Sequence, residues 1–339
     1  MTNTTEPTPD YIEEFQRAIK LEKIFLPSAS NKRFEFFQRP EENQNPFARF
    51  VHYTTAEAAL NIIKNKRIWM RNTTCMTDYR EVCHGHDILK EVFSKASLKD
   101  DFIQALELCH EGSAAEADKL FSQWLNSIQT QTFITSISEH GDGEDFNGRL
   151  SMWRAFGRNV ARVGIVLKVP WRSEVTRKLG LIFGPVHYAT TDQVYKELLA
   201  VIDNIRDHSD FLKSLRRENV VGALFNMFRS RVVCCKHEAF HEEREWRVIY
   251  SPTIWNSPLM QSSIVVVAGI PQTIYQIPLG SNDSAPQDDL DLSRLFDRLI
   301  IGPTPYPWVM YEAFTTALKE AGITNADQLV WTSRIPIRT

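Results

Sequence analysis

Short stretches of alternating apolar and polar positions run through this chain, which is the pattern of β-strands with one buried face. This alternation predicts a strand over residues 244–250, whereas β-branched residues predict one over 132–138 and a buried apolar run predicts one over 298–303. Further short strands are predicted over residues 47–53, 67–70, 161–169, 181–189, 264–267 and 328–333. Apolar residues at helical spacing predict helices over residues 10–26, 81–128 with a break at Gly112, 151–156, 191–206, 210–231 and 308–321. Residues 1–10, rich in Thr, Pro and Asn, are predicted to be disordered. Residues 28–46 are predicted to be a polar loop.

The most informative of these strands lies within residues 236–250, a stretch that begins as a charged turn and ends as a strand. Alternation puts Glu243, Glu245 and Arg247 on one face, opposite Trp246. Burial of an unpaired charge costs several kcal/mol or more. This face is therefore expected to carry either a structural ion-pair network or a polar site.

The order of elements predicts one large α+β domain over residues 47–339, preceded by a tail and helix over residues 1–46. The helix after the first strand is expected to start at Thr54, with Thr54 and Glu57 as a capping box. Helical blocks at about 84–130 and 190–232 are each flanked by strands. They are expected to be insertions that pack on the outside of the sheet.

Composition narrows the class of protein without naming a function. The chain has 339 residues, of which 43% are hydrophobic and 24% charged, as in an ordinary globular protein. A net charge of −3 gives no overall nucleic-acid signature. Five irregularly spaced cysteines argue against a disulfide framework. No apolar run is long enough for a membrane span, and residues 1–15 lack the features of a signal peptide, so a cytoplasmic location and no membrane partner are expected.

Several motifs, taken in order, resemble the bacterial family catalogued as domain of unknown function 2971. They cover roughly residues 47–337 and are found at residues 51–55, 68–69, 133–139, 152–153, 236–237 with Phe240, 243–247, 300–303 and 333–336. The family usually has an Asn-Asp-Pro type turn after the position of Trp69. This chain has Thr77-Asp78-Tyr79 there, so that motif is only partly kept.

The order of the same elements also resembles the ADP-ribosyltransferase superfamily. In that fold a first strand carries His or Arg, a second carries Tyr or a Ser-Thr-Ser run, and a later strand carries Glu. The matching positions are His52, the run at 135–138, and Glu245 with Glu243 as a Glu-x-Glu pair. This resemblance implies a split, mixed β-sheet core with peripheral helical insertions. It also implies an enzyme that uses NAD as a substrate and needs no metal.

The roles implied by the resemblance follow from the chemistry of the nicotinamide–ribose bond, which breaks through an oxocarbenium-like state. Glu245 is expected to stabilise the developing positive charge, and Glu243 to contact the acceptor. The residues expected to bind NAD are His52, Tyr53, Thr54, Ser136, Ser138 and Arg154. The acceptor is expected to be a macromolecule, either protein or nucleic acid, and the family type suggests a toxin or phage-defence effector.

Structural interpretations remain open for the same residues. His52 and Tyr53 are also suited to a packed core pair, and Met152-Trp153 to core packing. Ser136 and Ser138 fit an edge strand, and Arg154 a surface ion pair. If Glu245 and Arg247 neutralise each other, the protein would be a non-catalytic binding or scaffolding module.

Two metal-dependent alternatives compete with the transferase interpretation. Cys234, Cys235, His237 and His241 superficially suit zinc, but they lack a Cys-x2-Cys knuckle and adjacent cysteines rarely reach one ion. A metal-dependent nuclease would use acidic residues, namely Asp78, Glu81, Glu243 and Glu245. Its usual lysine is replaced by Arg247, so no metal is expected.

Overall fold

The computed structural model describes residues 9–37, 48–76, 80–155, 161–170, 174–280 and 290–336. The chain forms two compact units, each assembled from three segments. The first unit contains Met1–Phe36, Asp78–Gln129 and Val186–Glu238. The second contains Phe37–Thr77, Thr130–Pro185 and Ala239–Thr339.

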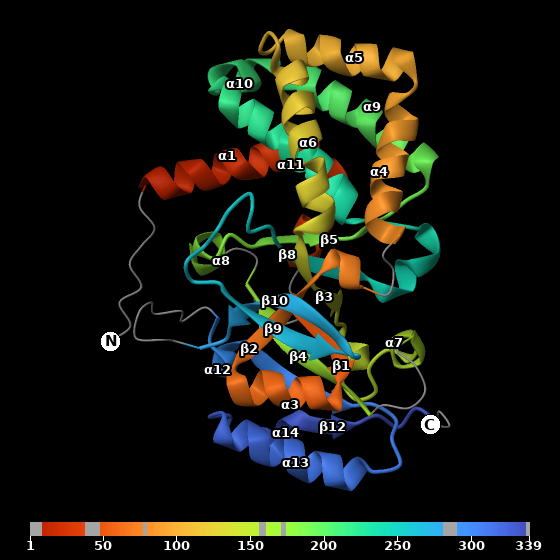
Figure 1. Cartoon of the computed structure of the whole chain (residues 1–339), viewed down its shortest axis with the longest axis vertical. Helices are drawn as coiled ribbons and strands as arrows, with labels where there is room; N and C mark the ends of the chain where they lie inside the picture. Colours follow the sequence, from red (N-terminus) through yellow and green to blue (C-terminus); the bar gives the residue numbers. More distant parts are fainter. Residues whose placement is uncertain are drawn as a thin grey trace. The chain divides into compact units, whose positions relative to one another are not determined.

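The first unit is almost entirely helical within the described residues (Figure 1). Its helices are α1 (Pro9–Phe25), α2 (Pro27–Phe37), α4 (Arg80–Phe93), α5 (Ala96–Glu107), α6 (Ser113–Thr130), α9 (Thr191–Asp207), α10 (Ser209–Ser214) and α11 (Arg217–Val233). A short parallel pair joins β6 (His187–Tyr188) to β7 (Cys235–Lys236). The apolar face of α9 is buried through Leu198, Val201 and Ile205. Both helical blocks expected as insertions lie in this unit, together with the N-terminal helices.

The second unit is built on a ten-stranded mixed sheet. Its strands are β1 (Ala48–Thr55), β2 (Arg67–Asn72), β3 (Phe133–Glu139), β4 (Arg162–Val169), β5 (Ile182–Pro185), β8 (Glu245–Tyr250), β9 (Gln261–Val267), β10 (Ile270–Pro278), β11 (Phe296–Ile301) and β12 (Val330–Thr332). The main path runs β12-β11-β4-β1-β3-β2-β10-β9, and β8 pairs with β3 and β5. β11 and β12 are parallel, and the other pairs of this sheet are antiparallel.

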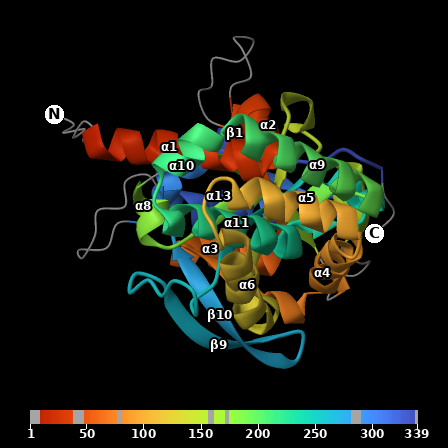
Figure 2. The same cartoon turned by 90° about the horizontal axis from the view of Figure 1, so that it is seen from above.

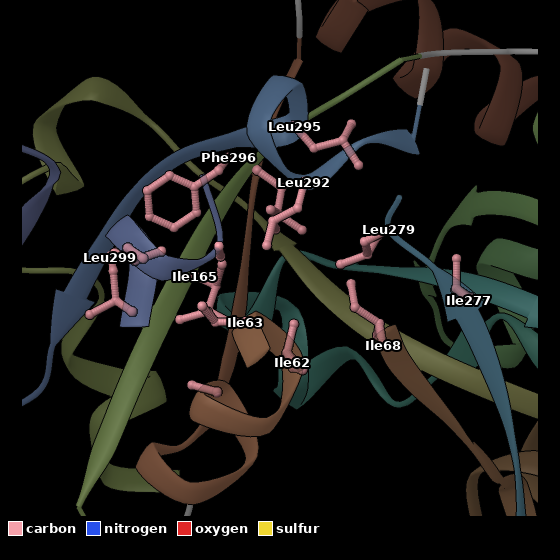
Figure 3. Close-up of a cluster of buried hydrophobic side chains, with 14 of the residues drawn as sticks. Ile62, Ile63, Ile68, Ile165, Ile277, Leu279, Leu292, Leu295, Phe296 and Leu299 are labelled. Carbon is pink, nitrogen blue, oxygen red and sulfur yellow. The ribbon is translucent and has the colours of Figure 1, made fainter. Parts of the chain in front are cut away.

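Alternating residues of the strands enter two separate cores. On one face, side chains from α3 (Ala56–Asn65), α12 (Leu292–Leu295) and α13 (Pro307–Glu320) pack over β2, β4, β10 and β11. Figure 3 shows the part of this core between α3, α12 and these strands. The opposite face carries a smaller core in which Met152 and Trp153 of α7 (Leu150–Ala155) pack on Val51 and Tyr53. The second unit also contains the short helices α8 (Glu174–Lys178) and α14 (Ala326–Leu329).

The sheet divides where β1 and β2 meet the same edge of β3. β1 pairs with Ser138 and Glu139 at one end of β3, and β2 pairs with Phe133 and Ile134 at the other end. The middle of that edge pairs with neither strand. There, the hydroxyl of Thr135 donates to the carbonyl of Trp69 at 2.7 Å. An α+β class with a mixed sheet is thus confirmed.

Several sequence-based boundaries were wrong, for identifiable reasons. Helix α3 begins after Thr55 rather than Thr54, because the pairing of β1 with β4 continues through Thr54 to Thr55, which is the N-cap. Part of the predicted loop at 28–46 is the helix α2, whose first residue is Pro27, a position where proline is favoured. The strand predicted at 181–189 is two strands with different partners, β5 and β6. Strand β10 was not predicted at all.

Candidate functional site

The centre of the candidate site is a cross-strand cluster on β3 and β8. Ser136 lies opposite Arg247, and Ser138 lies opposite Glu245, so all four side chains start from one face of the sheet. The Ser136 hydroxyl donates to Glu245 Oε1 at 2.5 Å. Arg247 donates from Nε to the same oxygen at 2.9 Å and from Nη2 to Oε2 at 3.1 Å. Glu245 is only 5% exposed and Arg247 2% exposed, so this is a buried, bidentate ion pair.

His52 is tied to the same cluster through the main chain. Its Nδ1 lies 2.9 Å from the carbonyl oxygen of Ser136, at the place where the sheet divides. Because a carbonyl only accepts hydrogen bonds, Nδ1 carries the proton and the ring is the neutral Nδ1–H tautomer. Burial lowers the pKa of His52, which also favours the neutral ring. The imidazole thus supplies a hydrogen bond that no neighbouring strand gives to this carbonyl.

Strand register places His52 and Glu245 on different faces of the sheet. Val51 lies opposite Ser138, and Phe50 lies opposite Glu139. Since side chains alternate along β1, His52 and Thr54 share the face of Phe50, while Tyr53 shares the face of Glu245. The candidate residues therefore meet at the division of the sheet, with side chains from both faces. They do not form a single-faced cluster.

Glu243 does not belong to the strand that carries Glu245, as the alternation pattern had suggested. It is the last residue of a 3-10 helix, η3 (Glu238–Glu243), and the strand starts only at Glu245. Arg244, between them, has a φ of 44°, a left-handed conformation that interrupts a strand. The Glu243 and Glu245 side chains therefore do not share a strand face.

The other predicted NAD-binding residues have diverse surroundings. Tyr53 packs edge-to-face on Trp153 at 4.9 Å between ring centroids, and its hydroxyl accepts a hydrogen bond from the Arg149 amide at 2.8 Å. Burial raises the pKa of Tyr53 to about 12. Ser138 is buried and lies opposite Glu245 in the antiparallel pair of β3 and β8. Arg154 is exposed on α7, and no described contact links it to Glu245 or His52.

A residue that sequence reasoning missed, Arg149, joins the segments around the cluster. Its guanidinium donates to the carbonyl oxygens of Glu139 at 2.6 Å and Glu243 at 2.9 Å. It also pairs with Glu144, with 2.8 Å between Nε and Oε1. Arg149 thus fastens the loop after β3 to η3, which leads into Glu245. The available signal was a single arginine at the end of a loop that holds Asp142, Glu144 and Asp145.

A second network missed from the sequence holds the same loop to the sheet. Arg49 pairs with Asp145 at 2.5 Å and with Asp297 at 2.6 Å. His140 Nε2 lies 2.9 Å from Asp145 Oδ1, and the His140 side chain is fully enclosed. Burial alone would raise the pKa of Asp297, but Arg49 and Lys168 hold it below the usual value. The loop after β3 is thus attached to η3 through Arg149 and to β1 through Arg49.

The described residues can be searched for the ligands of a metal ion and for a membrane-spanning helix. No group of three or more His, Cys, Asp or Glu side chains is placed to hold a metal ion in the part of the chain that the structure describes. Asp78 and the side chain of Glu81, needed for the nuclease alternative, lie outside the described residues. Within the same limits, no helix combines the length and the apolar character that crossing a membrane requires.

Comparison with known protein families gives a match over part of the chain. Residues 152–248 match the family model described as protein of unknown function (DUF2971). The resemblance predicted from the motifs is therefore confirmed over α7 to β8. No curated protein and no solved structure matches the chain significantly. The matched segment includes Glu243 and Glu245 and ends one residue after Arg247.

Proposed function

We propose that this protein transfers ADP-ribose from NAD in the manner of an ADP-ribosyltransferase, at the division of the sheet between β1 and β2. One observation carries the proposal. The Ser136 hydroxyl donates a hydrogen bond to Glu245, and the Ser136 carbonyl accepts one from His52. Two hydrogen bonds thus link the three positions that the resemblance to the ADP-ribosyltransferase superfamily implies. The three residues come from strands far apart in sequence. Their association is what a site would require.

The proposed step breaks the bond between ribose C1′ and the nicotinamide nitrogen, and nicotinamide leaves with the bonding electrons. A nucleophilic oxygen or nitrogen of the acceptor then bonds to C1′ and loses its proton. Glu245 would stabilise positive charge at C1′, and Ser136 and Arg247 hold its two carboxylate oxygens in place. His52, with Nδ1 committed to the Ser136 carbonyl, presents Nε2 as an acceptor for a ribose hydroxyl.

The direct test measures nicotinamide released from NAD, by chromatography, with water, protein or nucleic acid as acceptor. Ser136→Ala is expected to lower the rate on the order of a hundredfold, the typical effect of losing one preorganised contact. Glu320→Gln, an exposed site on α13 in the same unit, should behave as the wild type. Turnover of folded Ser136→Ala at the wild-type rate would refute the assignment, as would a folded wild type that releases no nicotinamide with any acceptor.

A second candidate is a non-catalytic binding module, favoured by the burial of the Glu245–Arg247 pair. A guanidinium that bonds both oxygens of a carboxylate offsets part of its charge and strengthens the sheet. In that case the cluster of Ser136, Glu245 and Arg247 stabilises the pairing of β3 with β8 and has no catalytic role. Wild-type protein without NAD turnover, together with destabilised Ser136 and Glu245 variants, would identify this function.

A further inference from the structure

Strand β9 forms an open edge of the sheet and lacks the features that normally protect such edges. It is the last strand on the path, and among the described strands it pairs with β10 only. Figure 2 shows β9 on the outer side of β10. Edge strands are usually protected by charges, proline or a bulge. β9 reads Gln-Ser-Ser-Ile-Val-Val-Val, and its pairing with β10 continues without a register shift.

The apolar side chains of this strand are exposed to an unusual degree. Ile264 is 79% exposed and Val266 is 68% exposed, and both point to the same face of β9. The surrounding sequence contains no Asp, Glu, Lys, Arg or His from Val248 to Asn282. The nearby Arg71 guanidinium donates to Gln272 on the face of Val265, so the face of Ile264 and Val266 has no charge from this stretch to attract a charged partner. A second copy of the same neutral strand meets no repulsion.

The hairpin fixes which backbone groups face outward. β9 and β10 are joined by Ala268 and Gly269, both with positive φ, which is the geometry of a tight two-residue hairpin. Val267 and Ile270 then form a hydrogen-bonded pair, and the next pair, Val266 with Pro271, is not hydrogen-bonded. Pro271, which has no N–H, sits where β10 needs no donor. The N–H and C=O groups of Ser262, Ile264 and Val266 therefore point to the open edge.

We propose that β9 pairs antiparallel with β9 of a second copy of this chain, around a two-fold axis at Ile264. Ile264 is the central residue of Gln261–Val267, so the strand pairs with itself over its full length. Ile264 meets Ile264 of the second copy, and Val266 meets Ser262. Such a contact uses the same surface on both copies and closes after two. Both open edges are removed in one continuous sheet.

The contact is small, so the dimer should be concentration-dependent. A standard interface takes about 20–30 residues from each side, whereas β9 offers seven. Sedimentation over a concentration series is therefore expected to show a monomer that converts to a dimer, with no larger species. Ile264→Lys puts two like charges at the axis and should leave a monomer. Val309→Lys removes a similarly exposed apolar side chain, on α13, and should still dimerise.

Cysteine cross-linking tests the register independently of affinity. Opposite residues in an antiparallel pair have Cα atoms about 5.5 Å apart, within the range of a disulfide. Ile264→Cys should therefore cross-link to itself on mild oxidation. Val266→Cys should not, because its two copies are offset by four residues, about 13 Å. A mixture of Ser262→Cys and Val266→Cys should cross-link.

The unmodified protein, which has five native cysteines, gives the background for these experiments. A protein that stays monomeric at its highest soluble concentration would overturn the proposal. So would a dimer that persists in folded Ile264→Lys, or efficient cross-linking of Val266→Cys to itself. Assembly beyond a dimer would show open aggregation at this edge and would also contradict it.

Discussion

Glu245 and Arg247 lie two residues apart on β8 and form a buried ion pair. We expect Glu245→Gln to lower the free energy of unfolding on the order of 3 kcal/mol, because Arg247 stays buried without the carboxylate that balances its charge. Urea unfolding measures this loss, and Glu320→Gln is the control. The double variant Glu245→Gln/Arg247→Gln should recover part of the loss, since it removes both charges. Additive losses in the double variant would contradict a coupled pair.

His187, in the first unit, gives stability a defined pH dependence. Burial first, and then the nearby charge of Arg231, lower the pKa of His187 to about 4. The unfolded chain binds this proton near pH 6.5, and the folded chain does so only near pH 4. The stabilisation is therefore fully present above about pH 6.5 and is lost as the pH falls toward 4.

The variant His187→Gln removes this titration, so its unfolding midpoint should fall less between pH 7.5 and pH 5 than that of the wild type. Urea midpoints at the two pH values provide the measurement. The exposed His241→Gln serves as the control for the loss of a histidine side chain. Equal pH dependence in His187→Gln and wild type would show that other groups carry the effect.

At the scale of single elements, the start of α3 separates two adjacent threonines. Both residues pair with β4, but the N-cap is Thr55, whose hydroxyl accepts a hydrogen bond from the amide of Ala58 at 3.1 Å. Thr55→Ala is expected to lower the free energy of unfolding by about 1 kcal/mol, the usual value of an N-cap. Thr54→Ala should have a smaller effect, and chemical denaturation of both variants measures the difference. A larger loss for Thr54→Ala would restore the capping box predicted from the sequence.

The loop after β3 and the helix η3 should loosen together when Arg149 is changed. Arg149→Lys keeps the charge but cannot reach Glu144 and the two carbonyl groups in one planar fork. We expect faster amide hydrogen exchange over residues 140–149 and 238–243, with α13 unchanged. The exposed Arg154→Lys is the control. Faster exchange in only one of the two segments would show that Arg149 does not couple them.

The sequence predicted β3 from its β-branched residues and β8 from its alternation, and in the structure both strands are buried on both faces. Alternation missed β10, because Pro271 and the alternating Gln and Thr residues weaken the strand signal. The association of Ser136 with Glu245 followed from the family order. The side of the sheet on which the His52 side chain lies could not be predicted, because it depends on how β1 pairs with β3. Local sequence does not specify that pairing. Arg149 was missed because a loop has no period from which contacts can be inferred.

At the scale of the whole molecule, the proposed site belongs to one unit. His52, Ser136 and Glu245 all lie in the second unit, and so do the other residues predicted for the NAD site. A ligand that binds only the folded form stabilises the part that binds it, by about 2.7 kcal/mol at a hundred times its dissociation constant. NAD is therefore expected to slow hydrogen exchange in the second unit and to leave exchange in the first unit as it was.

Hydrogen exchange with and without NAD, followed by peptide mass spectrometry, measures this difference. Protection should be strongest in β3 and β8, where Ser136 and Glu245 lie, and should be lost in Ser136→Ala. Adenosine, which lacks the nicotinamide and pyrophosphate, is the ligand control and should protect less. Protection confined to the first unit would move the site away from the division of the sheet. No protection in either unit would favour the binding module, whose ligand would then be something other than NAD.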